Sequence, residues 1–366
     1  MAKGCKADSA DYRALFLADT PFIDLRAPAE FAKGTFPTAM SLPLMTDKER
    51  AAVGTCYKQQ GQQAAINLGH KLVQGDIKEA RVRAWCDFAK ANPDGFLYCW
   101  RGGLRSQISQ QWMAEAGVLF PRVVGGYKAL RRFLIDSLEA LVASKQMLLL
   151  AGKTGCGKTL LLEQLPWSLD LEALANHNGS SFGLRLGGQP TQISFENALS
   201  IALLKLDSQG FESVLLEDES AHIGSLMLPN SLQQRMRQSP VILLETPLNE
   251  RVEIIFDEYI RHRLAQHLGG EGGYEAFCLY LRNAFKRIHK RLGADAYQHI
   301  SSLLEQALAA QPDSVLAGEL HRAWITELLV RYYDPMYEYQ LKKRPRACLF
   351  QGDKAQVLEF LANFTG

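Results

Sequence analysis

Two short segments of this chain combine residue types that could bind anions and do chemistry. The first is Tyr-Cys-Trp-Arg-Gly-Gly-Leu-Arg-Ser at positions 98–106, and the second is Gly-Lys-Thr-Gly-Cys-Gly-Lys-Thr at positions 152–159. The first segment places a cysteine in a glycine-bearing turn close to two arginines. The second segment matches the phosphate-binding pattern G-x-x-x-x-G-K-[ST] at every specified position. A thiol site and a diphosphate-type site in one chain form a rare pairing, which narrows the function.

The first segment predicts a reactive cysteine. A cysteine reacts as its thiolate, which a helix N-terminus and nearby cations stabilise. An apolar, strand-like run precedes Cys99, and the apolar residues that follow the turn are spaced for one face of a helix. Gly102 and Gly103 permit turns that direct backbone N–H groups inward as an anion site. We therefore predict Cys99, Arg101 and Arg105 as catalytic residues.

The second segment has the strand–loop–helix context of a phosphate-binding loop. An apolar strand is expected over residues 147–151 and a helix over residues 159–165. In such a loop the backbone N–H groups wrap phosphates, the lysine reaches the terminal phosphate and the hydroxyl can hold Mg²⁺. The predicted phosphate-binding residues are Gly152, Gly155, Gly157, Lys158 and Thr159.

The acid on the metal side of such a loop is expected at the end of a later buried strand. The run Glu-Asp-Glu-Ser at positions 217–220 follows an apolar strand over 213–216 and is the first candidate. We assign Asp218, together with Thr159, to a Mg²⁺ site. Glu245, after the apolar run 241–244, is the second candidate, although a solvated strand end explains it equally well.

Two basic clusters in the C-terminal third are candidates for RNA contacts. Within positions 282–291, Arg282, Lys286 and Lys290 share a face at helical spacing, which suits phosphate contacts. A solvated helix face is the alternative. The second cluster follows the aromatic run 332–339, whose rings could stack on bases or simply pack a core. Its members are Lys342, Lys343, Arg344 and Arg346.

These segments lie in a chain whose bulk properties are ordinary. A length of 366 residues predicts two or three domains, and a net charge of +2 does not by itself indicate a nucleic-acid binder. Seven irregularly spaced cysteines favour a reducing compartment over a disulfide framework, and none has zinc-site spacing. The N-terminus lacks a signal-peptide core, and no apolar run approaches the ~20 residues of a membrane helix. We expect a cytoplasmic location.

The pattern of strands and helices predicts an α/β fold in two domains. Short apolar strands alternate with amphipathic helices over residues 1–142. A short linker then leads into a P-loop domain over residues 146–366. From about residue 251 onward the P-loop domain becomes mostly helical and basic.

The N-terminal domain resembles the rhodanese family. The similar residues are Phe-Ile-Asp-Leu-Arg-Ala-Pro-Ala-Glu-Phe at positions 22–31, then Gly34, Pro37 and Ser-Leu-Pro at positions 41–43. This resemblance implies that Cys99 forms a persulfide and that Arg105 closes its loop. The histidine usual in this signature is Thr35 here. The Cys-x5-Arg spacing also occurs in rhodanese-like phosphatases, which remain an alternative, although they carry histidine where this chain has Tyr98.

A rhodanese-like domain followed by a P-loop domain resembles the bacterial tRNA 2-selenouridine synthase family, which depends on selenophosphate. Further similar stretches lie at positions 44–58, 177–183, 189–196 and 332–339. Where that family commonly has His-Arg-Gly-Ser, this chain has Asn178, so one cation expected near the P-loop is missing.

This resemblance implies a transferase that replaces the sulfur of 2-thiouridine at the tRNA wobble position with selenium. The implied route passes through S-geranyl-2-thiouridine, made from geranyl diphosphate, and through selenium bound to a cysteine. The implied co-substrates are selenophosphate and geranyl diphosphate, with Mg²⁺ as a further component. The implied partners are tRNA, which is held by its anticodon arm, and an enzyme that supplies selenophosphate. We expect no membrane association and a monomeric chain. Two other functions stay open: a tRNA-binding P-loop nucleotide triphosphatase with a regulatory rhodanese module, and a tRNA sulfurtransferase with ATP at the P-loop.

Overall fold

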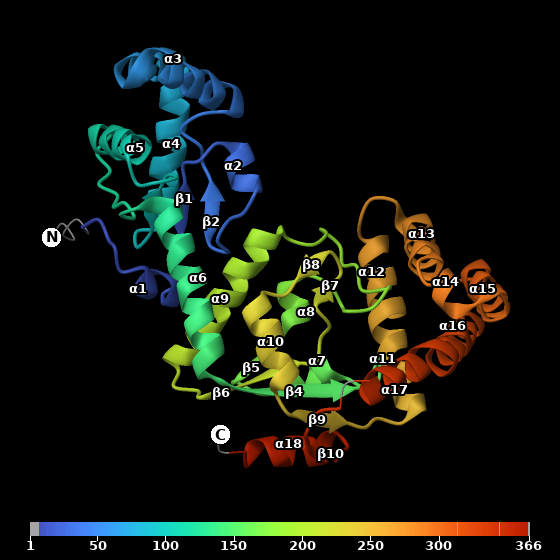
Figure 1. The fold of residues 1–366 in the computed structure, drawn as a ribbon. Helices are drawn as coiled ribbons and strands as arrows, with labels where there is room; N and C mark the ends of the chain where they lie inside the picture. The colour runs from blue at the N-terminus through green and yellow to red at the C-terminus, as the bar shows by residue number, and fades with distance from the viewer. Residues whose placement is uncertain (1–6, 313, 344, 365–366) are drawn as a thin grey trace. The chain divides into compact units, whose positions relative to one another are not determined.

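The structure is a computed structural model that describes residues 7–312, 314–343 and 345–364. The chain divides into two compact units (Figure 1). Unit 1 comprises Met1–Val142 and Pro190–Gly210, and unit 2 comprises Ala143–Gln189 and Phe211–Gly366. Among the described residues, no helix has both the length and the apolar character to cross a membrane. Arg344, one member of the second basic cluster, lies outside the described residues.

Unit 1 is built on a three-stranded parallel sheet of order β2-β1-β3. Every residue of β1 and β3 is buried, as expected for parallel strands covered on both faces. The elements of unit 1 are α1 (Tyr12–Leu17), β1 (Phe22–Asp24), α2 (Pro28–Ala32), β2 (Ala39–Ser41), α3 (Asp47–Leu72), α4 (Gly75–Ala91), β3 (Phe96–Tyr98), α5 (Leu104–Glu115), α6 (Gly126–Ser144) and α9 (Gln192–Ser208).

Helix α9 belongs to unit 1, although the sequence-based boundaries assign it to the P-loop domain. Its Asn197 is fully buried, accepts a hydrogen bond from Arg131 and donates one to the carbonyl of Thr35. Ile193 packs so closely on Gly34 that a Cβ there would come within 2.4 Å of its side chain. The chain thus returns from the P-loop unit to complete the core of the first unit, a long-range packing effect that local patterns do not reveal.

Unit 2 is built on a five-stranded parallel sheet of order β10-β9-β4-β6-β5. Its first elements are β4 (Gln146–Gly152), α7 (Lys158–Leu162), β5 (Ser168–Leu169), α8 (Leu171–Leu174), β6 (Ser213–Glu217), β7 (His222–Ile223), β8 (Leu226–Met227), α10 (Asn230–Gln238) and β9 (Val241–Leu244). Strand β4 lies at the centre of this sheet and leads directly into the P-loop. Ligands of open parallel sheets bind at the carboxyl ends of the strands, where this loop lies.

The C-terminal part of unit 2 is helical, as predicted, except for one strand. Its elements are α11 (Leu248–Phe256), the π-helix η1 (Asp257–His262), α12 (Arg263–Leu268), α13 (Gly273–Lys286), α14 (His289–Leu292), α15 (Ala294–Ala309), α16 (Val315–Leu328), the π-helix η2 (Leu329–Tyr333), α17 (Asp334–Lys343), β10 (Cys348–Gly352) and α18 (Lys354–Ala362). The helices enclose a separate core that includes Phe277, Phe285 and Trp324. Strand β10 pairs with β9 at the sheet edge, and the sequence analysis missed it.

Candidate functional site

Cys99 follows β3 directly, and α5 begins five residues later, at Leu104. The Cys99 side chain is 3% exposed, and its Sγ lies 3.4 Å from Ser106 Oγ in the first turn of that helix. Gly102 has φ +66°, and a Cβ there would lie 2.8 Å from the backbone nitrogen of Gly125. The backbone N–H of Tyr127 donates to the carbonyl of Cys99 at 2.9 Å. The glycines therefore allow the start of α6 to pack against the thiol loop and fix its shape.

A buried charge network supports the strand that carries this loop. The Arg26 guanidinium pairs with Asp24 at 2.7 Å, and both side chains are at most 1% exposed. The Tyr98 hydroxyl, one residue before Cys99, donates to the same Asp24 carboxylate at 2.9 Å. Arg26 also lies over the ring of Tyr127, 3.7 Å from its centroid. The segment 22–31 and the thiol loop are therefore joined by one network of buried polar contacts.

The two predicted arginines of the loop differ in their surroundings. Arg105 pairs with Glu30 at 2.7 Å, and this cation holds the pKa of Glu30 below its usual value although burial acts in the opposite direction. Arg105 therefore joins the thiol loop to the segment 22–31. Arg101 is exposed and has no ion pair with another described residue, so its guanidinium is free to meet a substrate.

The P-loop has the backbone geometry that its sequence predicts. Gly155 and Gly157 have φ values of +77° and +83°, which favour glycine, and Gly157 caps the start of α7. A Cβ on Gly152 would lie 2.5 Å from the Cys156 sulfur, so this first glycine is needed for close packing. Lys158 and Thr159 follow in the first turn of α7.

Residues from the C-terminal helices hold the P-loop in place. The Arg251 side chain donates to the carbonyl of Thr154 at 2.9 Å and pairs with Asp334 at 2.6 Å. Lys153, the second residue of the loop, pairs with Glu338 at 2.9 Å. Asp334 follows η2 directly, so the π-helical turn sets the position of its carboxylate. The loop is therefore fixed by the helical part of unit 2.

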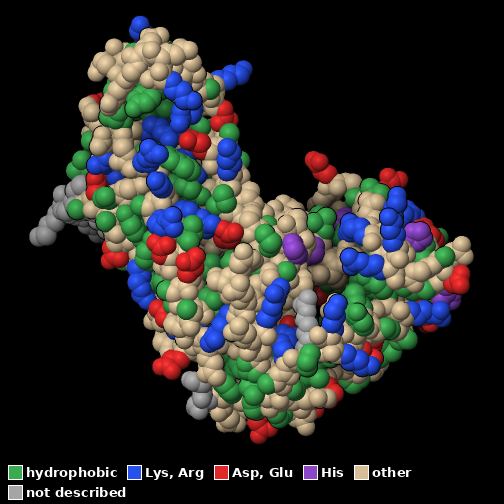
Figure 2. Space-filling view, viewed as in Figure 1, with side chains coloured by type: hydrophobic (Ala, Val, Ile, Leu, Met, Phe, Trp, Pro, Cys, Tyr) green, Lys and Arg blue, Asp and Glu red, His purple; other side chains and the backbone are tan. Residues whose placement is uncertain are grey.

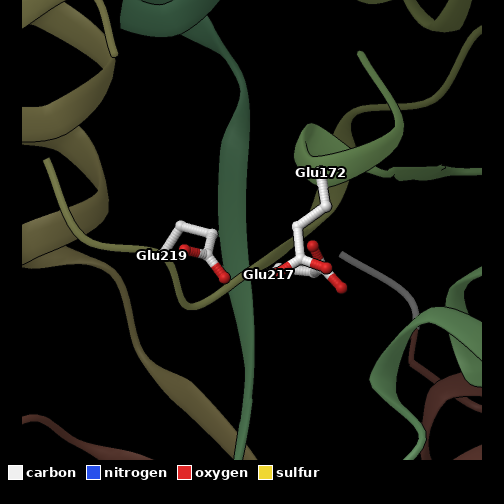
Figure 3. Close-up of side chains that lie close together, drawn as sticks. All are labelled: Glu172, Glu217 and Glu219. Carbon is white, nitrogen blue, oxygen red and sulfur yellow. The ribbon is translucent and has the colours of Figure 1, made fainter. Parts of the chain in front are cut away.

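Three carboxylates converge beside Lys158 and Thr159. Glu172 in α8, Glu217 at the end of β6 and Glu219 just after it have oxygens within 4.8 Å of one another, and Figure 3 shows them turned toward one another. The Thr159 hydroxyl donates to Glu217 Oε1 at 3.3 Å. The other oxygen of Glu217 is buried and has no hydrogen-bond partner among the described residues.

The electrostatics of this cluster favour a bound cation. Burial and the neighbouring carboxylates raise the pKa of Glu172 to about 10 and that of Glu217 to about 8, and the pKa of Glu219 is raised as well. Burial disfavours the charged form of Lys158, yet Cys156 and these glutamates raise the pKa of its ammonium group. Hard divalent cations prefer such oxygen ligands. The donor set therefore fits Mg²⁺.

The structure separates Asp218 from this cluster. Its carboxylate pairs with the Arg346 guanidinium and is not one of the three converging carboxylates, because successive side chains along a strand point to opposite faces. The carboxylate beside Thr159 is that of Glu217, one residue earlier. The second candidate, Glu245, is exposed and accepts a hydrogen bond from Gln351. Sequence reasoning missed Glu172, which comes from a separate helix and has no motif of its own.

The segment 177–183 closes over the carboxylate cluster. Gly179 has φ +40°, which favours glycine, and a Cβ there would come against the Glu172 carboxylate, so this backbone lies directly beside the cluster. The neighbouring Asn178 donates to Glu258 and accepts from Arg185. A guanidinium therefore lies beside residue 178 although this residue is itself uncharged.

The predicted RNA-binding residues are exposed but do not form one helical face. Helix α13 ends at Lys286, and Lys290 lies in the separate short helix α14. Arg282 is engaged by Glu305 at 2.7 Å. The neighbouring Phe285 is 2% exposed and packs in the helical core. Of the three predicted residues, Lys286 and Lys290 therefore remain without an ion pair to a described residue.

The aromatic run before the second basic cluster is mostly a packing feature. Tyr332 and Tyr333 are 8% and 7% exposed. Tyr339, by contrast, is 63% exposed and lies 5.7 Å from the Lys343 ammonium group. Arg346 pairs with Asp218, so Lys342 and Lys343 are the described cations of this cluster that are exposed and have no ion pair to a described residue.

The fold and the sites define a two-unit α/β protein that combines a loop thiol with a P-loop. Residues 145–365 match the family described as tRNA 2-selenouridine synthase AAA domain. The protein from Hahella chejuensis named tRNA 2-selenouridine synthase is 52% identical over 99% of this chain and 96% of its own length. Proteins of the same name from Pseudomonas syringae pv. syringae and Cupriavidus pinatubonensis are 52% and 50% identical, over 97% of this chain and 97% and 98% of theirs.

The chain therefore belongs to the tRNA 2-selenouridine synthase family. The family resemblance stated from the sequence is confirmed.

Proposed function

We propose that this protein is a tRNA-modifying transferase that replaces the sulfur of wobble 2-thiouridine with selenium. Near-full-length similarity to proteins named tRNA 2-selenouridine synthase is the observation that carries the proposal. Unit 1 acts as a rhodanese-like domain, in which Arg101 and Arg105 bind the anionic donor, selenophosphate, beside the Cys99 thiol. The buried Asp24–Arg26 pair supports this role, because it stabilises the loop without an ion pair to Arg101 or Arg105.

The P-loop unit handles a diphosphate in the proposed first step. The carbon–oxygen bond of geranyl diphosphate breaks, a carbon–sulfur bond to 2-thiouridine forms, and diphosphate leaves. In the second step the selenium of selenophosphate attacks C2, the C2–S bond breaks as the C2–Se bond forms, and the geranyl chain departs as a thiol. Water then cleaves the P–Se bond, which releases phosphate and leaves 2-selenouridine. Lys158 and the N–H groups of the loop are suited to the departing diphosphate, because they concentrate positive charge where negative charge develops.

Mg²⁺ is the cation that fits the P-loop site. Thr159, Glu217, Glu172 and Glu219 would hold it, and the buried unpaired oxygen of Glu217 supports this assignment. When bound, Mg²⁺ would neutralise charge on the diphosphate. The protein's own part is to position Lys158 and to close the site with the backbone at Gly179.

The tRNA substrate is proposed to contact exposed cations of the C-terminal helices. Lys286 and Lys290 are exposed and have no ion pair with a described residue, which suits phosphate contacts. The anticodon arm is the part of tRNA that carries the wobble base, so it must reach the thiol.

The two alternatives predict different reactions at the P-loop. A nucleotide triphosphatase would hydrolyse ATP when tRNA is added, and a sulfurtransferase would need ATP and would install sulfur. Purified 2-thiouridine tRNA is incubated with the protein, geranyl diphosphate and selenophosphate, and its nucleosides are analysed by mass spectrometry. Formation of 2-selenouridine without ATP supports the proposal, whereas its absence together with tRNA-stimulated ATP hydrolysis contradicts it.

A further inference from the structure

Unit 1 contains a large apolar cavity that the steps above do not use. Its volume is about 610 Å³, within the range of small-molecule pockets. It lies between α3, the segment around Met45 and the first turns of α5. Its apolar lining is formed by Leu44, Met45, Val53, Ala65, Ile66, Val73, Leu104, Ile108 and Trp112. Figure 2 shows hydrophobic side chains below α3, with Lys and Arg side chains beside them.

The cavity exists because α3 folds back on itself. Gly61 has φ +83° and ψ −176°, which breaks the helix into two halves. Residues on the two halves face each other, since a Cβ on Gly69 would lie 3.9 Å from Val53 Cγ2. The apolar sides of the two halves are covered by α5 only in part. An apolar hollow of this size that remains open to solvent is typical of a ligand site.

Three of the polar side chains that line the cavity are cations, and none is an acid. Arg50 and Arg105 both approach the single carboxylate of Glu30, at 3.8 and 2.7 Å, so their combined charge exceeds its charge. Lys58 is exposed and has no ion pair with another described residue. A ligand that matches this lining has a hydrocarbon body and an anionic end.

The position of the cavity links it to the thiol. Leu104 and Arg105, which line the cavity, belong to the turn of α5 that follows the Cys99 loop. Ser106, in the same turn, lies 3.4 Å from the Cys99 sulfur. One end of a hydrocarbon ligand that fills the cavity therefore lies next to the turn of α5 that contacts the thiol.

We infer that this cavity binds the prenyl chain of an S-prenylated uridine while the uridine is presented to Cys99. The flanking phosphates of the RNA then lie against Arg50 and Lys58. This inference rests on the proposed function, because that function supplies an S-geranyl uridine as the substrate of the second step. It goes beyond that function by assigning recognition of the hydrocarbon to unit 1. The prenyl group, and not only the uracil base, then determines which RNA is bound.

Two neighbouring positions of α3 provide the test. Ile66 lines the cavity, whereas Asn67 is exposed and does not line it. Ile66→Trp fills the cavity, and Asn67→Trp adds the same side chain outside it. Each full-length variant is titrated with two anticodon stem-loop RNAs that carry S-geranyl- or S-methyl-2-thiouridine, and circular dichroism verifies the fold.

The wild type is expected to bind the geranyl RNA about tenfold or more tightly than the methyl RNA, because the hydrocarbon is buried. Ile66→Trp should abolish this preference without weakening binding of the methyl RNA, and Asn67→Trp should keep it. An equal affinity of the wild type for both RNAs, or a preference unchanged in Ile66→Trp, overturns the inference. Selenation of the same RNAs is measured in parallel. Failure of the wild type to selenate either RNA counts against the proposed function alone, because binding is scored separately.

Discussion

The thiol site and the P-loop site balance their charges in opposite ways. In unit 1 two of the three arginines near the thiol have partners, since Arg26 pairs with Asp24 and Arg105 with Glu30, whereas Arg101 is exposed. In unit 2 the carboxylates of Glu172, Glu217 and Glu219 crowd together, and their pKa values are raised. The ion pairs near the thiol are thus made within the protein, whereas the proposed Mg²⁺ and diphosphate would balance the charges of the P-loop site.

This difference assigns different tasks to the two regions. A rigid, paired site suits a step in which one atom must be held and handed over, because the loop need not rearrange. A site with unsatisfied charge couples its order to ligand binding, because the ligand relieves the repulsion. The comparison therefore predicts that substitutions in unit 1 remove one chemical step, whereas substitutions in unit 2 also change how the protein responds to metal.

The largest expected effect is that of Cys99→Ala. Selenation should fall below detection while S-geranylated tRNA still accumulates, because the thiol is needed only for the second step. Nucleoside mass spectrometry of the treated tRNA measures both products. Cys348→Ala is the control, since this free cysteine is exposed at the sheet edge of unit 2. Near-normal 2-selenouridine formation by Cys99→Ala would refute the role of the thiol.

The second largest effect is that of Lys158→Ala, which should remove the first step and leave the second. Lys158→Ala should reduce geranylation by about a hundredfold or more, since electrostatic stabilisation of a leaving group contributes on that order. Selenation of pre-geranylated tRNA should continue. Lys153→Ala provides a matched control, because this lysine lies in the same loop but is engaged by Glu338. Loss of both steps in Lys158→Ala would contradict the division of labour.

The P-loop and the strands that lead into the two sites could be predicted from the sequence. The P-loop matches a pattern whose glycines have the φ values that it requires, and the apolar runs before Cys99 and Gly152 are buried parallel strands. These features depend on local sequence alone. The segment 122–124 forms isolated bridges with Leu97 and Ser9 and is not a further strand of the sheet.

Other features depend on contacts between distant segments and could not be predicted. The choice of Glu217 over Asp218 depends on which face of the sheet each side chain reaches, and Arg346 decides it from 128 residues away. Helix α9 returns to unit 1 through Asn197, which no local pattern indicates. The cavity depends on the kink at Gly61, where a positive φ interrupts α3.

The third effect tests the unbalanced charge of the P-loop site through pH. Glu217 has a pKa of about 8 in the folded protein against an ordinary value of 4.5, so the folded state retains a proton that the unfolded state has lost. Without metal, stability should therefore fall as pH rises from about 4.5 through 8. Saturating Mg²⁺ should reverse this trend, because metal binding displaces the proton.

Glu217→Gln and Asp218→Asn should respond differently in the same thermal melts. Glu217→Gln should flatten the pH dependence and reduce the Mg²⁺-induced rise in Tm, which is roughly 2–4 °C per kcal/mol of binding for a unit of this size. Asp218→Asn should lower Tm because Arg346 loses its partner, yet keep the Mg²⁺ response. A lost Mg²⁺ response in Asp218→Asn with an intact response in Glu217→Gln would restore Asp218 as the metal ligand.

The smallest expected effect concerns tRNA binding by the basic residues of unit 2. Each lost phosphate contact should reduce the slope of log affinity against log salt concentration by roughly 0.7–0.9. Lys286→Ala with Lys290→Ala should therefore make the slope shallower by about 1.4–1.8. Adding Arg282→Ala should change it little, because Glu305 already neutralises this guanidinium. Fluorescence anisotropy with labelled tRNA at several salt concentrations measures the slopes. An unchanged slope in the folded double variant would assign these lysines to an ordinary solvated surface, and Lys342 and Lys343 would be substituted next.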